Sequence, residues 1–107
     1  MSFNLESNTV GIEFADKYLT LRHFGGLFKK KVEFEARISY RNIDYLEYEE
    51  QVKGWDKRKY IYITIGLINP QPEFNTTTLD IEIESTYFSE KDYLKQLEEY
   101  SKKINKE

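Results

Sequence analysis

The chain has 107 residues, no cysteine and a net charge of −3. A chain of this length holds one hydrophobic core, so we expect a single domain over residues 1–107. The lack of cysteine excludes a disulfide framework and a thiolate zinc site, and the acidic balance argues against a dedicated nucleic-acid binder.

Signals for export or membrane insertion are missing from the printed sequence. The first fifteen residues have neither a basic start nor an apolar segment, so a signal peptide is not expected. The longest mainly apolar stretch, residues 61–68, is far shorter than the ~20 residues that a membrane-spanning helix needs. We therefore expect a cytoplasmic protein.

Alternation of apolar and polar residues dominates the first part of the chain. It predicts a hairpin from residues 8–14 and 17–23, because Val10, Ile12 and Phe14 fall on one side of the first strand. A loop containing two glycines follows. The clearest strand then covers residues 30–40, and its predicted inward side carries Val32, Phe34, Ala36, Ile38 and Tyr40.

Three further strands are predicted, which places the strands roughly within residues 8–85. Residues 43–49 form a short strand, and the polar stretch 51–58 with Gly54 is read as a loop. Residues 60–68 carry bulky groups on both faces, which is typical of a central strand or one covered on both sides. Two prolines end that strand, a loop follows to residue 77, and residues 78–85 form the last strand.

The periodicity then changes to that of a helix, predicted over residues 89–105. Ser89 suits an N-cap, with acidic residues in the first turn. A helix this short seldom survives alone in water, so we expect it to dock on the sheet. Its apolar stripe contains Tyr93, Leu94, Leu97, Tyr100 and Ile104.

Several local patterns resemble those of small bacterial domains of the pleckstrin-homology (PH) superfold. Residues 10–14 followed by 18–21 look like the opening hairpin, residues 38–43 look like the step into the next strand, and residues 88–104 look like the closing helix. The resemblance implies a mainly β domain with one C-terminal α-helix, in which a bent antiparallel sheet forms a partly open barrel capped by the helix. It also implies a binding module for lipid headgroups, peptides or a second copy of the chain.

No pattern of catalytic or metal-binding residues stands out. His23 is the only histidine, and no spacing of hydroxyl and carboxyl groups supports a triad around it. Asp80, Glu82 and Glu84 share one strand face, where a weak calcium site is conceivable but a solvated acidic face is the simpler interpretation. We expect no enzyme, no cofactor and no metal.

The main candidate for contact is a basic cluster in residues 22–31. In PH domains that bind phosphoinositides, basic residues around an early loop hold the phosphates, although Glu33 and Glu35 would oppose this here. The alternative is an ordinary solvated loop with a buried phenylalanine. The contact candidates in this cluster are Arg22, Phe24, Phe28, Lys29, Lys30 and Lys31.

The second candidate is Trp55 with Arg58 in a polar, basic loop. A lone tryptophan there is either folded back on the core or a contact anchor. The nine tyrosines either fill sheet faces or leave an aromatic contact patch. We predict a non-catalytic interaction module that binds a protein or peptide or associates with itself, and not a nucleic acid. The alternative is peripheral binding to anionic lipid headgroups through residues 22–31.

Overall fold

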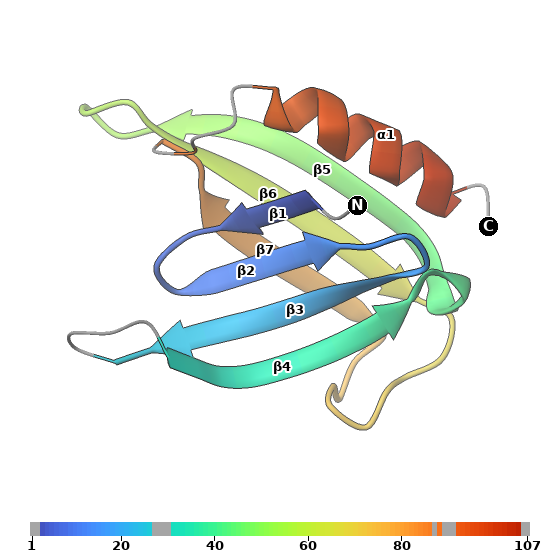
Figure 1. The fold of residues 1–107 in the computed structure, drawn as a ribbon. Helices are drawn as coiled ribbons and strands as arrows, with labels where there is room; N and C mark the ends of the chain where they lie inside the picture. Colours follow the sequence, from blue (N-terminus) through green and yellow to red (C-terminus); the bar gives the residue numbers. More distant parts are fainter. Residues whose placement is uncertain (1–2, 27–30, 87, 89–91, 106–107) are drawn as a thin grey trace.

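The computed structural model describes residues 3–26, 31–86, 88 and 92–105. Strands make up most of this part of the chain, and one helix closes it (Figure 1). In chain order the elements are β1 (Phe3–Glu6), β2 (Val10–Phe14), β3 (Tyr18–Gly25), β4 (Lys31–Ser39), the 3-10 turn η1 (Tyr40–Asn42), β5 (Ile43–Lys53), β6 (Arg58–Leu67), β7 (Thr78–Glu84) and α1 (Tyr93–Asn105).

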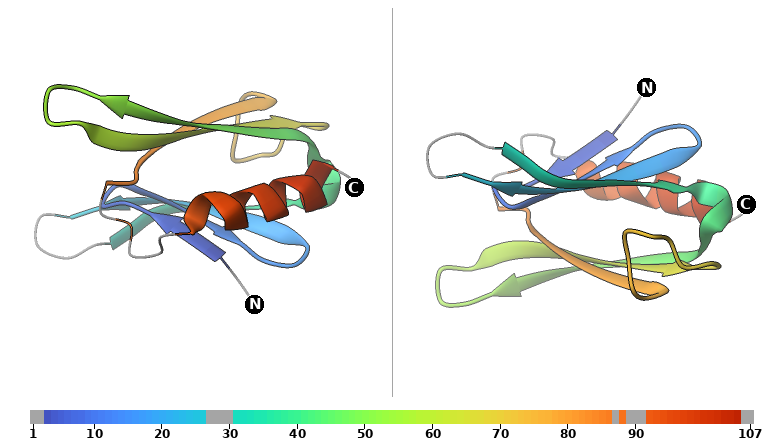
Figure 2. Two further views of the ribbon diagram at one scale, coloured as in Figure 1. Left: turned by 90° about the horizontal axis from the view of Figure 1, so that it is seen from above. Right: turned by 90° about the horizontal axis from the view of Figure 1, so that it is seen from below.

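The strands form two antiparallel sheets, one with the order β1-β2-β3-β4 and the other with the order β5-β6-β7. The sheets face each other as two layers, with α1 along one side (Figure 2). The prediction of a mainly β fold with a C-terminal helix is confirmed. The prediction of one bent sheet forming a partly open barrel is corrected in one respect, since the two sheets are not closed into a barrel. The chain changes sheet at η1, where the Ser39 side chain accepts a hydrogen bond from the Arg41 amide.

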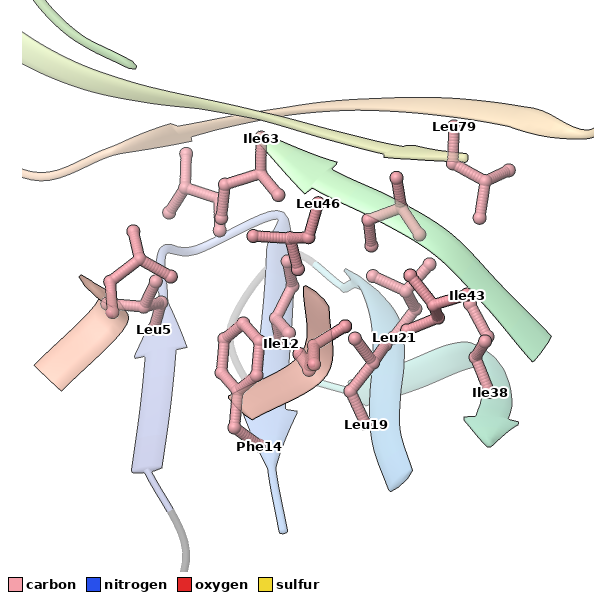
Figure 3. Close-up of a cluster of buried hydrophobic side chains, with 14 of the residues drawn as sticks. Leu5, Ile12, Phe14, Leu19, Leu21, Ile38, Ile43, Leu46, Ile63 and Leu79 are labelled. Carbon is pink, nitrogen blue, oxygen red and sulfur yellow. The ribbon is translucent and has the colours of Figure 1, made fainter. Parts of the chain in front are cut away.

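The core lies between the two layers (Figure 3). Alternation along the strands turns every second side chain inward, so Phe14 and Leu19 from one sheet and Leu46 and Ile63 from the other belong to the same core cluster. All four of these side chains are buried. β6 lies at the centre of its sheet, as its apolar sequence predicts.

Helix α1 packs along the side where β1 and β5 are the edge strands (Figures 1 and 2). Leu97 is completely buried beneath it. The side-chain amide of Asn105 pairs with the edge backbone of Leu46, accepting from its N–H at 3.0 Å and donating to its carbonyl oxygen at 3.3 Å. The Phe3 and Tyr100 rings stack with centroids 5.9 Å apart. The expected docking of the helix is therefore confirmed.

Three sequence-based expectations were wrong in detail. β1 was not predicted, although Phe3 and Leu5 alternate with polar residues and are buried against the core. β5 continues to Lys53 instead of ending near residue 49, because its polar end pairs with β6. Val32 is 46% exposed instead of inward-facing; it pairs with Phe24, beyond a register shift that separates it from the pair of His23 and Phe34. The expected N-cap at Ser89 lies outside the described residues.

Candidate functional site

The β5–β6 hairpin ends in a tight turn that projects from the body of the molecule (Figures 1 and 2). Gly54 has a φ of 81° and Lys57 a φ of 53°, and the Lys57 amide donates to the Gly54 carbonyl oxygen at 3.2 Å. Glycine adopts such left-handed backbone conformations without the steric cost that a side chain brings. The strands thus stay paired up to Lys53 and Arg58, and the residues between them form a defined tip.

Trp55 lies at this tip and is 96% exposed. It does not fold back on the core, which rejects one of the two interpretations of its sequence context. A tryptophan offers 150–250 Å² of mostly apolar surface, about as much as any side chain can bring to a contact. Its exposure at the end of a paired hairpin leaves that surface available to a partner.

The charged groups around the tip differ in how far they are already paired. Arg58 Nε lies 2.7 Å from a carboxylate oxygen of Asp56, and its Nη1 lies 3.8 Å from Glu84. The Lys53 ammonium lies over the Tyr62 ring, 4.7 Å from its centroid. Lys57 and Lys59 are exposed on either side of Arg58, so the tip combines an apolar tryptophan with a basic flank.

The outer face of the β5-β6-β7 sheet is acidic, in contrast to the basic flank of the hairpin tip. The Tyr60 and Tyr62 side chains are half-buried along β6, and β7 contributes Asp80, Glu82 and Glu84 beside them. The Tyr62 hydroxyl and nearby Glu82 raise the pKa of Lys53, so this lysine keeps its charge over the rings. The predicted acidic face of the last strand is present, with aromatic rings at its centre.

Arg22 belongs to a structural ion-pair network. On β3 it donates to Glu13 at 2.9 Å and to Glu35 at 2.7 Å. Hydrogen bonding to Glu35, and to a smaller extent to Glu13, raises the pKa of Arg22. The two carboxylates already occupy its guanidinium. Arg22 is therefore unsuited to holding a phosphate without breaking these pairs.

The other described residues of the predicted basic cluster, Phe24 and Lys31, lie on strands β3 and β4. Phe24 is half-buried with its ring against Gly11, where an added Cβ would come within 3.1 Å of it. Lys31 is exposed at the start of β4. Phe28, Lys29 and Lys30 lie outside the described residues.

The described residues do not form a metal centre. In residues 3–26, 31–86, 88 and 92–105, no three His, Asp or Glu side chains come together closely enough to hold an ion. His23 is exposed on β3, and its ring meets the edge of the Phe34 ring at 5.7 Å between centroids. In the same part of the chain, no helix is long and apolar enough to cross a membrane.

Comparison of the chain with family models, with curated proteins and with solved structures gave no significant match. The interpretation of its surfaces therefore rests on its own residues. The structure brings Trp55 and Arg58 together at the hairpin tip and places Arg22 and Phe24 in separate packing and ion-pair contacts. The acidic residues of β7 were interpreted in the sequence as a solvated face, with a weak calcium site as the alternative. The position of this strand at a sheet edge depends on strand order.

Proposed function

We propose that this chain is a non-catalytic interaction module of the PH-like type that binds a protein partner through the tip of the β5–β6 hairpin. The observation that carries the proposal is the 96% exposure of Trp55 at the end of a paired hairpin. The PH-like part is supported by two antiparallel sheets followed by a C-terminal helix that packs against β5.

The energetic case for the tip is simple. Burying a tryptophan removes 150–250 Å² from water, which at ~25 cal/mol per Å² is about 4–6 kcal/mol before the costs of association. Tryptophan and arginine are also the residues that most often dominate protein interfaces. Trp55 with Arg58 nearby fits that pattern.

Capture of partners from the native cell tests the proposal. Wild-type protein, Trp55→Ala and Ile68→Ala are used as baits, and bound proteins are identified by mass spectrometry. Ile68 is 55% exposed and lies outside the hairpin, so its variant controls for loss of any exposed apolar group. We expect a partner that is lost with Trp55→Ala and retained with Ile68→Ala. A partner set that Trp55→Ala leaves unchanged would reject the hairpin tip as the contact.

Self-association is one form of the same proposal. Size-exclusion chromatography with light scattering at several concentrations measures it directly. A mass that rises with concentration for the wild type, but not for Trp55→Ala, supports contact between copies through the tip. A monomer at every concentration removes this form and leaves a different protein as the partner.

A second candidate function is binding to anionic lipid headgroups through residues 22–31. One observation favours it: the end of β3 and the start of β4 lie at the same end of the molecule as the β5–β6 tip (Figure 1). Lys31 is therefore at the end that also carries Trp55, Lys57 and Lys59. Each lysine near an anionic surface contributes about 1 kcal/mol, and tryptophan favours the membrane interface.

Sedimentation with vesicles tests this candidate. We expect the wild type to bind vesicles containing phosphatidylserine, with a shift of Trp55 emission to shorter wavelength. The chain has one tryptophan, so the signal comes from the tip alone. The variant Lys29→Glu with Lys31→Glu should lose binding. Equal binding by this variant and the wild type would reject the basic loop.

A further inference from the structure

β7 is an edge strand of the β5-β6-β7 sheet. Among the described strands β7 pairs with β6 alone, and its other edge lies on the side of the molecule opposite α1 (Figures 1 and 2). The edges of β1 and β5 lie beside α1, and part of β4 is covered where Gln71 Nε2 donates to the Arg37 carbonyl oxygen at 3.2 Å. No described strand pairs with the outer edge of β7.

The register shows which backbone groups of β7 face outward. The Ser85 amide donates to the Lys59 carbonyl oxygen at 2.8 Å, and the Leu67 amide donates to the Thr77 carbonyl oxygen at 2.7 Å. Alternate residues of an antiparallel pair share this orientation. The intervening residues therefore turn their N–H and carbonyl groups to the free edge; they are Thr78, Asp80, Glu82 and Glu84.

The Thr78 amide donates to the Thr76 hydroxyl at 3.1 Å. The outward backbone groups of Asp80, Glu82 and Glu84 have no hydrogen-bond partner among residues 3–26, 31–86, 88 and 92–105. An extended peptide that adds to the edge would pair with them, which is a common mode of peptide recognition. The geometry needed for strand addition is already present because β7 is held in place by β6.

Side chains on β7 define what such a peptide must carry. Asp80 and Glu82 are exposed on the outer face of the sheet, whereas Ile81 is half-buried on the inner face between the buried Leu79 and Ile83. Opposite charges on neighbouring strands attract, and apolar groups beside Ile81 would cover its remaining exposed surface. The complementary strand alternates basic and apolar residues.

A second copy of this chain does not fit the same edge. Pairing of two β7 edges would place rows of Asp80, Glu82 and Glu84 beside each other, and like charges on adjacent strands are destabilising. Charged side chains on an edge strand are also a known protection against pairing between copies. The negative charge of β7 thus disfavours pairing between two copies of β7 and favours pairing with a basic strand.

We propose that the free edge of β7 binds an extended segment of a partner protein in which lysine or arginine alternates with apolar residues. This site is separate from the hairpin tip, and its test does not involve Trp55. The two proposals can therefore fail independently.

The probe is a short synthetic peptide of alternating lysine and valine with blocked ends. Binding is measured by NMR on isotope-labelled protein, together with the hydrogen exchange of individual amides. We expect the amides of Asp80, Glu82 and Glu84 to exchange more slowly when the peptide is bound. A peptide of the same sequence that is N-methylated at every residue keeps its charge but has no backbone N–H to donate along the edge, and we expect it not to protect these amides.

Charge reversal tests the chemistry of recognition. Glu82→Lys should weaken binding of the lysine–valine peptide about fivefold, the equivalent of one cross-strand ion pair of about 1 kcal/mol. Glu49→Lys is the matched control: it makes the same charge change on the same face, but on β5. At about 4.8 Å per strand, position 49 lies roughly 14 Å from an added strand, beyond the ~8 Å screening length at physiological salt. Its effect should be less than twofold.

A backbone variant separates strand addition from simple charge attraction. Glu82→Pro removes an N–H that faces the free edge but leaves the ladder to β6 intact, which is where proline is tolerated in a sheet. It should keep the native NMR spectrum of the core and lose peptide binding. The proposal is overturned if the three β7 amides are not protected, if the N-methylated peptide binds equally well, or if Glu49→Lys weakens binding as much as Glu82→Lys.

Discussion

Truncation of Leu97 to alanine tests whether α1 is an integral part of the fold. Leu97 is fully buried between α1 and the sheets, while Leu94, three residues earlier on the same helix, is 36% exposed. Leu97→Ala removes the same atoms as Leu94→Ala, but at a site where the surroundings can close only partly around the gap. Buried Leu→Ala changes cost 2–5 kcal/mol, so we expect a loss of about 3 kcal/mol in the free energy of unfolding.

Urea denaturation followed by circular dichroism measures this loss. For a domain of this size the slope is about 1.5 kcal/mol per molar urea, so the midpoint should fall by about 2 M for Leu97→Ala. Leu94→Ala should lower the free energy of unfolding by less than about 1 kcal/mol, because its side chain is already partly in water. Total stabilities of 5–15 kcal/mol are typical, so the Leu97 variant should remain folded without denaturant. Equal midpoints for the two variants would refute the docked position of the helix.

Three further predictions concern single side chains. Trp55→Ala should change the free energy of unfolding by less than about 0.5 kcal/mol in urea titrations, because the side chain is almost fully exposed. Tyr40→Phe should cost about 1 kcal/mol at neutral pH, since the Tyr40 hydroxyl donates to the Ala15 carbonyl oxygen. Burial raises the pKa of Tyr40 well above its ordinary value of 10.0. The contribution of the Tyr40 hydroxyl to the free energy of unfolding is therefore present below pH 10 and is lost at higher pH. The Tyr40→Phe variant should accordingly lose less stability at alkaline pH than the wild type in thermal melts. Arg22→Gln should lower stability by about 1 kcal/mol at low salt and by less in 1 M NaCl, measured by the same melts, because its two ion pairs are partly exposed.

The strands were largely predictable because alternation is a local property of the sequence. The hairpin of β2 and β3, the central position of β6 and the apolar stripe of α1 all follow from periods of two and of three to four residues. The division into two sheets was not predictable in this way. It depends on which distant strands pair, and the turn at η1 gives no apolar pattern that would reveal it.

The errors near strand ends have a common physical cause. The end of β5 is polar and reads as a loop, yet Val52 pairs with Lys59 and Lys53 with Arg58, so hydrogen bonding to β6 extends the strand beyond its apolar part. Val32 alternates correctly with its neighbours but becomes exposed after the register shift between His23 and Phe24. In both cases tertiary pairing overrides a local pattern.

The candidate contacts were only partly predictable for a related reason. Composition singles out Trp55, but whether it packs inward depends on how far the hairpin projects. The basic cluster looks continuous in the sequence, whereas β-pairing places Arg22 between Glu13 and Glu35 and removes it from any free basic surface. The acidic residues of β7 become candidates for a contact only once that strand is known to lie at a sheet edge.

The arrangement of covered and open edges limits where a partner can bind. Asn105 satisfies the Leu46 backbone at the β5 edge, so a strand could add there only by displacing α1 and exposing Leu97. Displacing α1 would remove most of the free energy of unfolding that the helix contributes. The loss of Leu97 packing alone would cost about 2–5 kcal/mol. The β7 edge needs no displacement, since none of the described strands other than β6 pairs with it. Binding by strand addition is therefore favoured on the side opposite the helix, and loosening of α1 by Leu97→Ala should make the β5 edge a second, less selective site.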